Sequence, residues 1–336
     1  MAARTRFAVV GLGFGEYHVR TIANMGDADL VAVADFDDQR LERVGSAYHC
    51  RTYKDAAQMM DELDLDAVSV CVSPAYRAPI LQAAADANLA VFVEKPWASN
   101  ARHAAELREI CRANESPVMT GFSFRFHPVV QRAIAAIRDE LGSVQLGSGA
   151  YVFGWLPPAE HWLWDPANGG GYFNENSCHL LDVVCALAGR PEEVFAYGVR
   201  DSDRPSDKAA TVAIRLAGGG TVSLNLGGVG TGAVTDYPWL ELFTRHGYAR
   251  LTGQNHVWRK LEWARHENGE VHRFDAPPEQ LGRTRYTDAL EHFVSALRAG
   301  SAPEASIDDG VLMVQLADAI RESIRSGRPV SISGNP

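Results

Sequence analysis

Residues 7–16 read Phe-Ala-Val-Val-Gly-Leu-Gly-Phe-Gly-Glu, an apolar run followed by glycines at three alternate positions. The apolar run predicts a buried strand, and the stretch after it has the pattern of a helix. Gly11 permits a tight turn, and Gly13 lets the backbone approach a pyrophosphate at the helix N-terminus. The fingerprint of such loops has its third glycine at the position of Glu16. We expect Gly15 to serve in its place if the turn is one residue tighter. The alternative is a glycine-rich turn that binds no ligand.

An acidic residue, Asp35, ends the next predicted strand (30–34) and stands 24 residues after Gly11. A carboxylate at this point accepts hydrogen bonds from the adenosine ribose hydroxyls of a dinucleotide. It also repels a 2′-phosphate, and Asp37 and Asp38 add to that repulsion. The sequence therefore favours NAD over NADP as the cofactor. The alternative is a carboxylate that only caps the second helix.

The alternation of short apolar runs with amphipathic stretches predicts a parallel sheet with helices on both faces. The strands expected in it are 7–10, 30–34, 67–72, 90–93 and 118–120. After about residue 123 a helix leads into β-rich sequence, with strands expected at 144–153, 194–199, 209–216, 221–226, 240–243 and 256–263. We therefore predict an α/β chain. Its N-terminal domain (1–122) is a Rossmann domain with a doubly wound parallel sheet, and its C-terminal α+β domain (123–336) has a largely antiparallel, open sheet.

The composition excludes several classes of partner. The chain has 336 residues, 46% of them hydrophobic, and a formal net charge of −10. An acidic chain repels nucleic acid and anionic membranes, so we expect neither as a partner. No apolar stretch approaches the ~20 residues of a membrane span, and the N-terminus lacks the pattern of a signal peptide. The five cysteines lack the spacing of metal ligands. We therefore expect a cytoplasmic protein with reduced thiols and no metal site.

A lysine, Lys95, directly follows the predicted strand at 90–93 in the segment Glu94-Lys95-Pro96. Ligands bind at the carboxyl ends of strands in open α/β sheets. Pro96 disfavours helical geometry at Lys95, so this side chain is held in a fixed direction. Without further context, however, a lysine is more often an ordinary surface cation.

Taken in order, these motifs resemble those of the glucose–fructose oxidoreductase/inositol dehydrogenase/MocA (Gfo/Idh/MocA) family over nearly the whole chain. The matching elements are the glycine loop, Val72-Ser73-Pro74, Glu94-Lys95-Pro96, Arg125 and Pro128, Gly169-Gly-Gly171 with Glu175 and His179, and the ending from Tyr286 and Phe293 to residues 327–330. The chain differs from the family pattern in several places besides Glu16. The turn after Pro74 is one residue short. Arg77 stands where a histidine is common, and Glu175 and Ser177 replace the aspartate and glycine of the second signature.

The resemblance implies an NAD(P)-dependent dehydrogenase or reductase acting on CH–OH groups of sugars, cyclitols and related polyols. It also implies homodimers or homotetramers formed through the C-terminal sheet. The lysine of Glu-Lys-Pro stands beside the nicotinamide and the substrate in this family, and the Ser-Pro turn lies near the nicotinamide ribose. The residues expected to bind the cofactor are Gly11, Gly13, Phe14, Gly15, Asp35, Ser73, Pro74, Glu94, Lys95 and Pro96. Those expected to contact the substrate are Trp97, Arg125, Asn176, Tyr286 and Trp162.

Trp162 shares a loop rich in proline and glycine with Trp155 and Trp164. Indoles in such a loop stack on the apolar faces of sugar rings. They equally well pack the loop itself or an oligomer interface, and the sequence does not decide between these roles.

The chemistry is expected from Lys95, Glu175 and His179. Glu175 and His179 are four positions apart, so a helix over about 173–187 places them on one face. Oxidation of a secondary alcohol needs a base, and an imidazole with a pKa near 6.5 suits this role. Glu175 would orient the imidazole, and Lys95 would stabilise developing alkoxide charge. The alternatives are a structural histidine and a solvated carboxylate; we interpret Asp182, one turn on, as structural.

The resulting hypothesis is an NAD-dependent oxidoreductase that transfers a hydride between nicotinamide and a secondary hydroxyl or ketone of a sugar, cyclitol or sugar derivative. The alternative is a non-catalytic sugar or dinucleotide sensor on the same fold. A third possibility keeps the enzyme but has two sugars alternately reduce and oxidise a tightly held cofactor.

Overall fold

The computed structural model describes residues 3–112, 116–165, 167–200, 206–267, 269–281 and 286–332. The chain divides into two compact units, which are described separately. Unit 1 comprises Met1–Phe122 and Thr284–Val311, and unit 2 comprises Ser123–Arg283 and Leu312–Pro336. The division expected from the sequence did not include this return of the chain to unit 1. Within the described ranges, no helix combines the length and apolar character that a membrane span requires.

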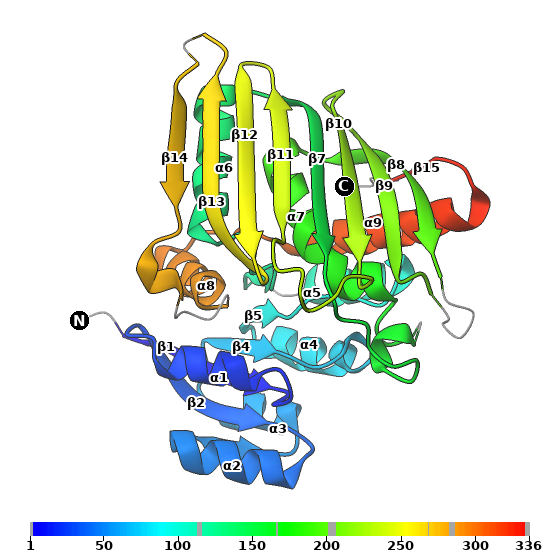
Figure 1. Cartoon of the computed structure of the whole chain (residues 1–336). Helices are drawn as coiled ribbons and strands as arrows, with labels where there is room; N and C mark the ends of the chain where they lie inside the picture. Colours follow the sequence, from blue (N-terminus) through cyan, green and yellow to red (C-terminus); the bar gives the residue numbers. More distant parts are fainter. Residues whose placement is uncertain are drawn as a thin grey trace. The chain divides into compact units, whose positions relative to one another are not determined.

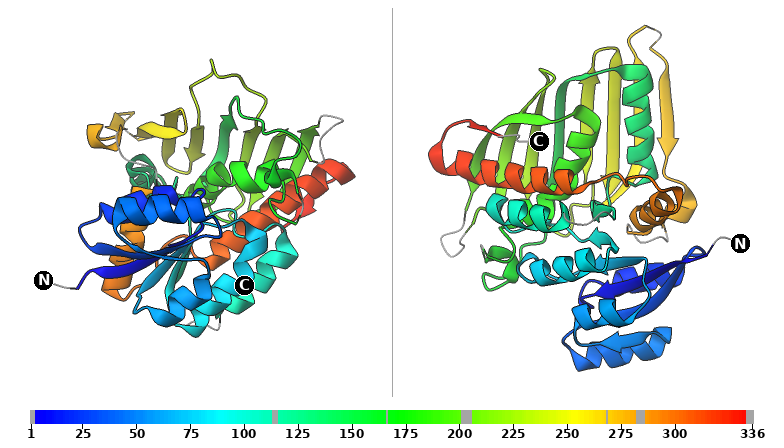
Figure 2. Two further views of the ribbon diagram at one scale, coloured as in Figure 1. Left: turned by 90° about the horizontal axis from the view of Figure 1, so that it is seen from below. Right: turned by 180° about the vertical axis from the view of Figure 1, so that it is seen from behind.

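Unit 1 is built on a sheet whose described strands all run parallel (Figure 1). Across the sheet their order is β3-β2-β1-β4-β5-β6. The strands are β1 (Thr5–Val10), β2 (Ala28–Ala34), β3 (Arg51–Tyr53), β4 (Ala67–Val70), β5 (Ala90–Val93) and β6 (Val118–Thr120). The helices are α1 (Glu16–Ala23), α2 (Asp38–Tyr48), α3 (Ala56–Glu62), α4 (Arg77–Asp86), α5 (Ala101–Arg112) and α8 (Thr287–Ala299), with a 3₁₀ turn at Pro74–Tyr76. They cover both faces of the sheet (Figure 2).

The strand order confirms the predicted doubly wound Rossmann sheet, because it reverses direction between β1 and β4. In such sheets the ligand crevice lies beyond the carboxyl ends of the strands at this reversal. Gly11 follows β1 directly, and Cys71 follows β4. The glycine loop predicted from the sequence therefore stands where the topology places a dinucleotide. The sequence prediction had omitted β3 and α3, which are short.

Unit 2 contains a largely antiparallel sheet, as predicted. Among its described strands the order is β14-β13-β12-β11-β7-β10-β9-β8-β15, and only β7 and β10 pair in parallel. The strands are β7 (Val144–Val152), β8 (Pro191–Val199), β9 (Ala209–Leu216), β10 (Thr221–Gly227), β11 (Trp239–Thr244), β12 (Gly247–Gln254), β13 (Val257–Arg265), β14 (Val271–Asp275) and β15 (Val330–Ser331).

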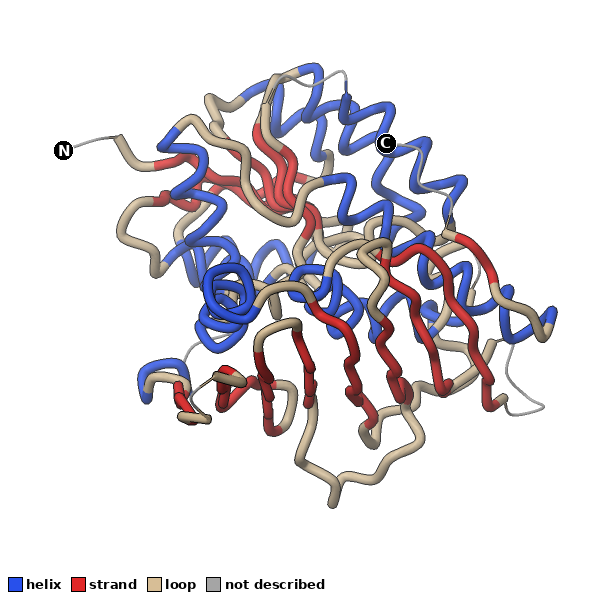
Figure 3. The backbone as a smooth tube through the Cα atoms, turned by 90° about the horizontal axis from the view of Figure 1, so that it is seen from above, coloured by secondary structure: helices blue, strands red, loops and turns tan. Residues whose placement is uncertain are grey.

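Helices lie on one face of this sheet and leave the other open (Figures 2 and 3). They are α6 (Pro128–Ala136), α7 (Cys178–Ala188) and the part of α9 (Ile307–Ser326) that belongs to unit 2. The helix predicted over 173–187 begins instead with a π-helical turn at Phe173–Ser177, and α7 follows it. A second π-helical turn, Ile137–Leu141, ends α6, and 3₁₀ turns lie at Trp162–Trp164 and Pro278–Leu281.

Candidate active site

Two glycines shape the loop between β1 and α1. Gly11 has φ +87°, in the region that favours glycine, and a Cβ there would lie 2.7 Å from Cγ1 of Val72. A Cβ on Gly15 would lie 2.1 Å from the carbonyl oxygen of Gly11. Gly15 therefore allows the close approach of helix and strand that the third glycine of the fingerprint provides. Glu16 does not obstruct the loop, because its carboxylate pairs with Arg43 on α2 at 2.7 Å.

Gly13 is the exposed member of the loop. A Cβ on Gly13 would meet only the guanidinium of Arg40, with its nearest atom 3.5 Å away. The loop borders a hollow of about 400 Å³, lined by Gly13, Glu16, Tyr17, Arg20 and Tyr48. Backbone without a side chain thus faces solvent at the start of α1, where helix N–H groups attract an anion. This cradle, which a Cβ would fill, fits the pyrophosphate of a dinucleotide.

Asp35 is buried at the end of β2, 6% exposed, and its carboxylate is fixed by backbone groups. Its Oδ2 accepts a hydrogen bond from the amide of Leu12 (2.5 Å), and its Oδ1 accepts one from the amide of Asp37 (2.9 Å). Arg40 adds a cation 3.7 Å from Oδ2. Asp37, not Asp35, caps α2, because its Oδ1 accepts from the amides of Gln39 and Arg40. The alternative role of Asp35 as a helix cap is therefore wrong.

Arg77 ties the loop after β4 to the loop after β5. The residue is fully buried, and its guanidinium donates to the carbonyl of Val72 (3.0 and 3.1 Å), to that of Trp97 (2.9 Å) and to that of Pro96. Burial lowers the pKa of Arg77 to about 10, so it remains a cation at neutral pH. An arginine therefore stands where a histidine is common because it holds three carbonyls of these loops. The Ser73-Pro74 turn lies between Val72 and Arg77.

The segment Glu94-Lys95-Pro96 follows β5 as predicted, and the Lys95–Pro96 peptide bond is cis. Glu94 is buried, 3% exposed, and both of its carboxylate oxygens are engaged. Oε1 lies 3.0 Å from Nε2 of His18, and Oε2 accepts the amide of Lys95 at 3.0 Å. Lys95 itself is half-buried.

Within unit 2, His179 and its neighbours on α7 are buried. The imidazole of His179 stacks on the ring of Phe124, with the centroids 4.8 Å apart. Asp182 is fully buried, and its carboxylate binds the guanidinium of Arg125, whose Nε lies 3.1 Å from Oδ2. This ion pair holds α7, and with it His179, against the segment that precedes α6. Glu175 lies half-buried in the π-helical turn just before α7.

Two further polar groups lie in the π-helical turn. Asn176 is half-buried, and its Oδ1 has no hydrogen-bond partner among the described residues. Asn174 is fully buried and donates to the carbonyl of Gly169 (2.9 Å), so it fixes the glycine-rich segment before the turn. The unused acceptor of Asn176 is consistent with the substrate contact predicted for it, which stays a prediction.

The tryptophan loop divides its indoles between packing and exposure. Trp164 is buried against Tyr172, and its indole N–H donates to the carbonyl of Pro158 (3.0 Å). Trp155 and Trp162 are each 39% exposed. Trp164 therefore packs the loop, whereas Trp162 is partly exposed, and the stacking predicted for it stays a prediction.

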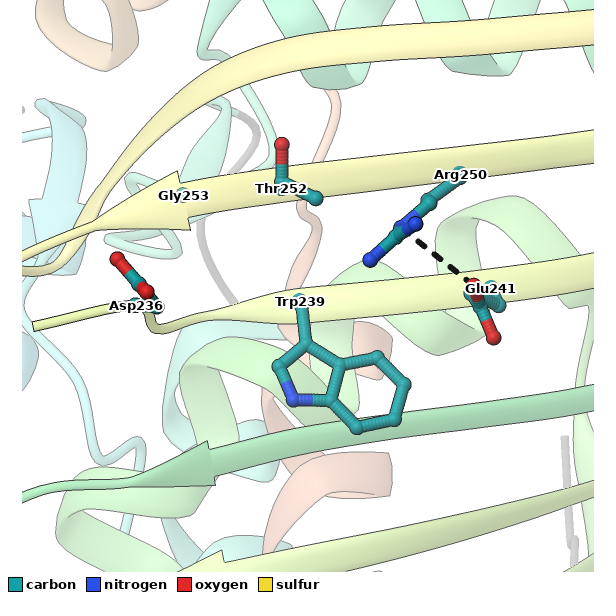
Figure 4. Close-up of a pocket in the computed structure, with 6 residues that line it drawn as sticks. All are labelled: Asp236, Trp239, Glu241, Arg250, Thr252 and Gly253. Carbon is teal, nitrogen blue, oxygen red and sulfur yellow. Dashed lines mark ion pairs between the residues drawn. The ribbon is translucent and has the colours of Figure 1, made fainter. Parts of the chain in front are cut away.

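A separate hollow of about 430 Å³ lies on the open face of the sheet in unit 2, between β11 and β12 (Figure 4). Its lining residues are Asp236, Trp239, Glu241, Arg250, Thr252 and Gly253, and the guanidinium of Arg250 pairs with Glu241 at 3.4 Å. It contains none of the residues predicted to be catalytic, and we interpret it as part of the sheet surface.

Comparisons with known proteins give the same assignment for both halves of the chain. Residues 5–122 match the model of the oxidoreductase family with an NAD-binding Rossmann fold, and residues 134–332 match that of its C-terminal alpha/beta domain. The chain belongs to the Gfo/Idh/MocA family.

Among the curated relatives, inositol 2-dehydrogenase of Rhizobium meliloti is 27% identical over 98% of this chain and 99% of its own length. D-apiose dehydrogenase of Paraburkholderia graminis is 25% identical over 98% of this chain and 90% of its own length. Among solved structures, an oxidoreductase from Agrobacterium radiobacter in complex with NAD⁺, L-tartaric acid and magnesium has a TM-score of 0.86 at 21% identity, covering 98% of this chain and 99% of that one.

Family membership confirms the predicted class, an NAD(P)-dependent oxidoreductase with a Rossmann cofactor domain, and favours it over the non-catalytic sensor. Lys95 belongs to unit 1, whereas Glu175 and His179 belong to unit 2. Their meeting around one substrate therefore stays a prediction, as do the individual site residues.

Three residues for which substrate contacts were predicted are held by neighbouring groups in their own units. Trp97 is fully buried, and its indole N–H donates to the carbonyl of Ala104 (3.2 Å). Tyr286 is 7% exposed, and its ring packs on Phe14 with centroids 5.1 Å apart. Arg125 is engaged by Asp182, as described above. All three side chains therefore support neighbouring elements, and the substrate contacts predicted for them stay predictions.

Sequence reasoning missed His18 as a site residue and had noted Arg77 only as a departure from the family pattern. Both touch the loop that carries Lys95 through buried polar contacts. The available signal was a histidine at the third position of the helix that follows a glycine loop, but nothing in the sequence identified Glu94 as its partner.

Proposed function

We propose that the protein is an NAD-dependent dehydrogenase or reductase of a secondary hydroxyl or ketone on a sugar, cyclitol or sugar derivative. The assignment of a dinucleotide cofactor rests on the glycine loop at Gly11, Gly13 and Gly15, with the Asp35 carboxylate fixed beside it. Bound nicotinamide would supply or accept the hydride. Asp35 would accept the ribose hydroxyls and disfavour a 2′-phosphate, which is the basis for NAD.

The proton chemistry is assigned to His179 and Lys95. His179 would take the hydroxyl proton as the substrate is oxidised and return it in the reverse direction. The ammonium of Lys95 would hydrogen-bond the same oxygen and stabilise its developing negative charge. Glu175, in the middle of the π-helical turn that leads into α7, would orient the imidazole. The buried ion pair between Arg125 and Asp182 supports this assignment because it fixes the helix that carries His179.

The substrate class rests on the relatives and on two indoles. Proteins similar to this chain are named for inositols, D-apiose and D-xylose. The half-exposed indoles of Trp155 and Trp162 would stack on the C–H faces of such rings. Because the relatives differ among themselves, the individual sugar and its reacting carbon are left to experiment.

The test follows NADH absorbance against a panel of inositols, aldoses, glycosides and sugar nucleotides, with NAD and NADP in parallel. Lys95→Ala is expected to abolish turnover, at least about 10³-fold, while NADH affinity stays within about threefold. Lys54→Ala is the matched control, an exposed lysine of the same unit paired with Asp38. Parallel loss of NADH binding and turnover in Lys95→Ala would count against the assigned role. NADH that co-purifies with the protein would favour the cycle with two sugars.

We also propose that the protein is a homodimer or homotetramer formed through the open face of the unit 2 sheet. This face exposes large apolar side chains, including Leu146 and Phe243, which are paired across β7 and β11. Exposed apolar patches of this kind mark protein interfaces. Phe243→Glu should lower the mass measured by light scattering, and an unchanged mass would remove this face from consideration. None of the five cysteines forms a disulfide in the described part of the chain, which is consistent with a cytoplasmic location, itself part of the proposal.

A further inference from the structure

His18 and Glu94 form a buried contact at the base of the segment that carries Lys95. His18, on the first turn of α1, is fully buried, and its two ring nitrogens face two different strands of the sheet. Nε2 lies 3.0 Å from Oε1 of Glu94, which follows β5, and Nδ1 lies 2.8 Å from Oγ of Ser69 on β4. The helix that begins at the glycine loop is thereby joined to the Glu94-Lys95-Pro96 loop.

Glu94 transmits this contact to Lys95. One carboxylate oxygen faces His18, and the other accepts the backbone amide of Lys95 at 3.0 Å. On the far side of Lys95, the carbonyl of Pro96 accepts from Arg77. The backbone of Lys95 is therefore held on both sides by buried charged groups, whereas its side chain extends from a half-buried position.

The environment keeps the pair between His18 and Glu94 charged. Burial alone lowers the pKa of an imidazole, but Cys71 and then Glu94 outweigh it and raise the pKa of His18 to about 10. The titratable and charged groups that face the pair are Cys71 on the β4 side, Arg77 on α4 and Tyr286 against the imidazole ring. Lys95, next in the chain, contacts Glu94 through its backbone amide. A buried carboxylate that loses such a partner takes up a proton more readily, although the more distant cation of Arg77 still acts on Glu94.

We propose that His18 is a positioning residue for the reaction: by keeping Glu94 ionised, it holds the Lys95 backbone, and so its ammonium, in the geometry that the reaction needs. The inference rests on the proposed function of Lys95. It adds a link between the start of α1, where the cofactor pyrophosphate is expected, and the residue that is expected to contact the substrate oxygen.

His18→Phe removes the cation and fits the aromatic surroundings, which include Phe14 and Phe92. In this variant Glu94 loses the buried cation at its Oε1, so it takes up a proton at a higher pH than it does beside His18. We expect kcat to fall about 10- to 100-fold with a new inflection in its pH profile, while NADH affinity stays within about threefold. Glu94→Gln has no carboxyl group to titrate, so the double variant His18→Phe/Glu94→Gln should lose the new inflection.

Phe293→Leu is the matched control for disturbed packing. Phe293 contacts Phe92, the β5 residue two positions before Glu94, through ring packing with centroids 5.7 Å apart. This variant should lower the melting temperature without adding an inflection to the pH profile of kcat. His18→Gln keeps a donor toward Glu94 without a fixed charge, and it replaces His18→Phe if the latter does not fold.

A second measurement does not depend on turnover. The chain has four lysines, Lys54, Lys95, Lys208 and Lys260. Selective ¹³Cε-lysine labelling therefore gives four signals, and Lys95→Arg identifies the signal of Lys95. In His18→Phe this signal should acquire a titration step that is absent from the wild type, from Phe293→Leu and from the double variant, while the other three signals stay unchanged.

Each outcome has a separate meaning. The positioning role would be overturned if His18→Phe and His18→Gln behaved like Phe293→Leu in both measurements. In that case neither the Lys95 signal nor the pH profile of kcat would show a new titration step. An absence of turnover in the wild type with every substrate of the panel would refute the proposed function. The titration of the Lys95 signal would still decide whether His18 controls that side chain.

Discussion

Gly15→Ala tests the reasoning about the glycine loop most directly. The added methyl carbon would lie 2.1 Å from the carbonyl oxygen of Gly11, 3.0 Å from Cβ of Cys71 and 3.1 Å from Cγ1 of Val9. These atoms belong to the loop, to the end of β4 and to β1, so the start of α1 has to move away from the sheet by about 1 Å. Overpacking of this kind costs about 3 kcal/mol when backbone must give way.

Two other glycines of unit 1 provide matched variants. Gly26→Ala adds a methyl group with nothing within 4 Å, so its stability should stay within about 0.5 kcal/mol of the wild type. Gly13→Ala meets only the end of Arg40 at 3.5 Å and should be equally stable. Its methyl group would nevertheless occupy the backbone surface expected to face the pyrophosphate. Loss of the charge-assisted hydrogen bonds there, about 1.5–3 kcal/mol each, lowers NADH affinity about 100-fold.

The assay is urea denaturation followed by circular dichroism, together with NADH fluorescence titration on the same samples. The expected pattern is reduced stability with reduced NADH affinity for Gly15→Ala, reduced affinity alone for Gly13→Ala, and neither effect for Gly26→Ala. If Gly15→Ala is as stable as Gly26→Ala, Gly15 does not serve as the third glycine. If Gly13→Ala binds NADH like the wild type, the pyrophosphate does not lie on this loop.

Three further predictions concern Asp35, Arg125 and His127. Asp35→Asn keeps an acceptor for the amide of Leu12 but removes the negative charge. The ratio of NADPH affinity to NADH affinity should therefore rise at least about tenfold. An unchanged ratio would contradict the assignment of Asp35 to the ribose. Arg125→Leu leaves Asp182 buried without its cation and should cost about 3–5 kcal/mol in urea denaturation, much of which the double variant Arg125→Leu/Asp182→Leu should restore. Burial and, after it, the charge of Arg259 lower the pKa of His127 from 6.5 to about 4. As the pH drops between these values, the unfolded chain binds the proton before the folded chain does. The free energy of unfolding should therefore fall by up to about 3 kcal/mol over this range. His127→Asn keeps an N-cap for α6 and should flatten that acid slope.

Local sequence signals were sufficient for the architecture of unit 1. The apolar runs at β1, β2, β4, β5 and β6 are each bounded by turn residues or by a helical pattern, and parallel strands buried on both faces need no partner information to be recognised. The return of residues 284–311 to unit 1 carries no such signal, because the amphipathic pattern of α8 fixes which side of the helix is buried but not against which sheet.

The site residues likewise differ in whether a local sequence signal identified them. Asp35 was identified because it directly follows a strand, and the sheet topology brings the carboxyl ends of the strands to one edge. Lys95 also follows a strand, but its role was assigned from the resemblance of Glu94-Lys95-Pro96 to the family motif. The burial of Trp97 and Tyr286 was not foreseen, because an aromatic side chain beside a predicted site has the same sequence pattern whether it faces a ligand or fills the core. His18 was missed because its partner, Glu94, lies 76 residues away and is brought to it only by the packing of α1 over the sheet. Long-range polar pairs of this kind fix the loops that carry reactive groups, so the residues that position Lys95 are the part of the site least accessible to local sequence patterns.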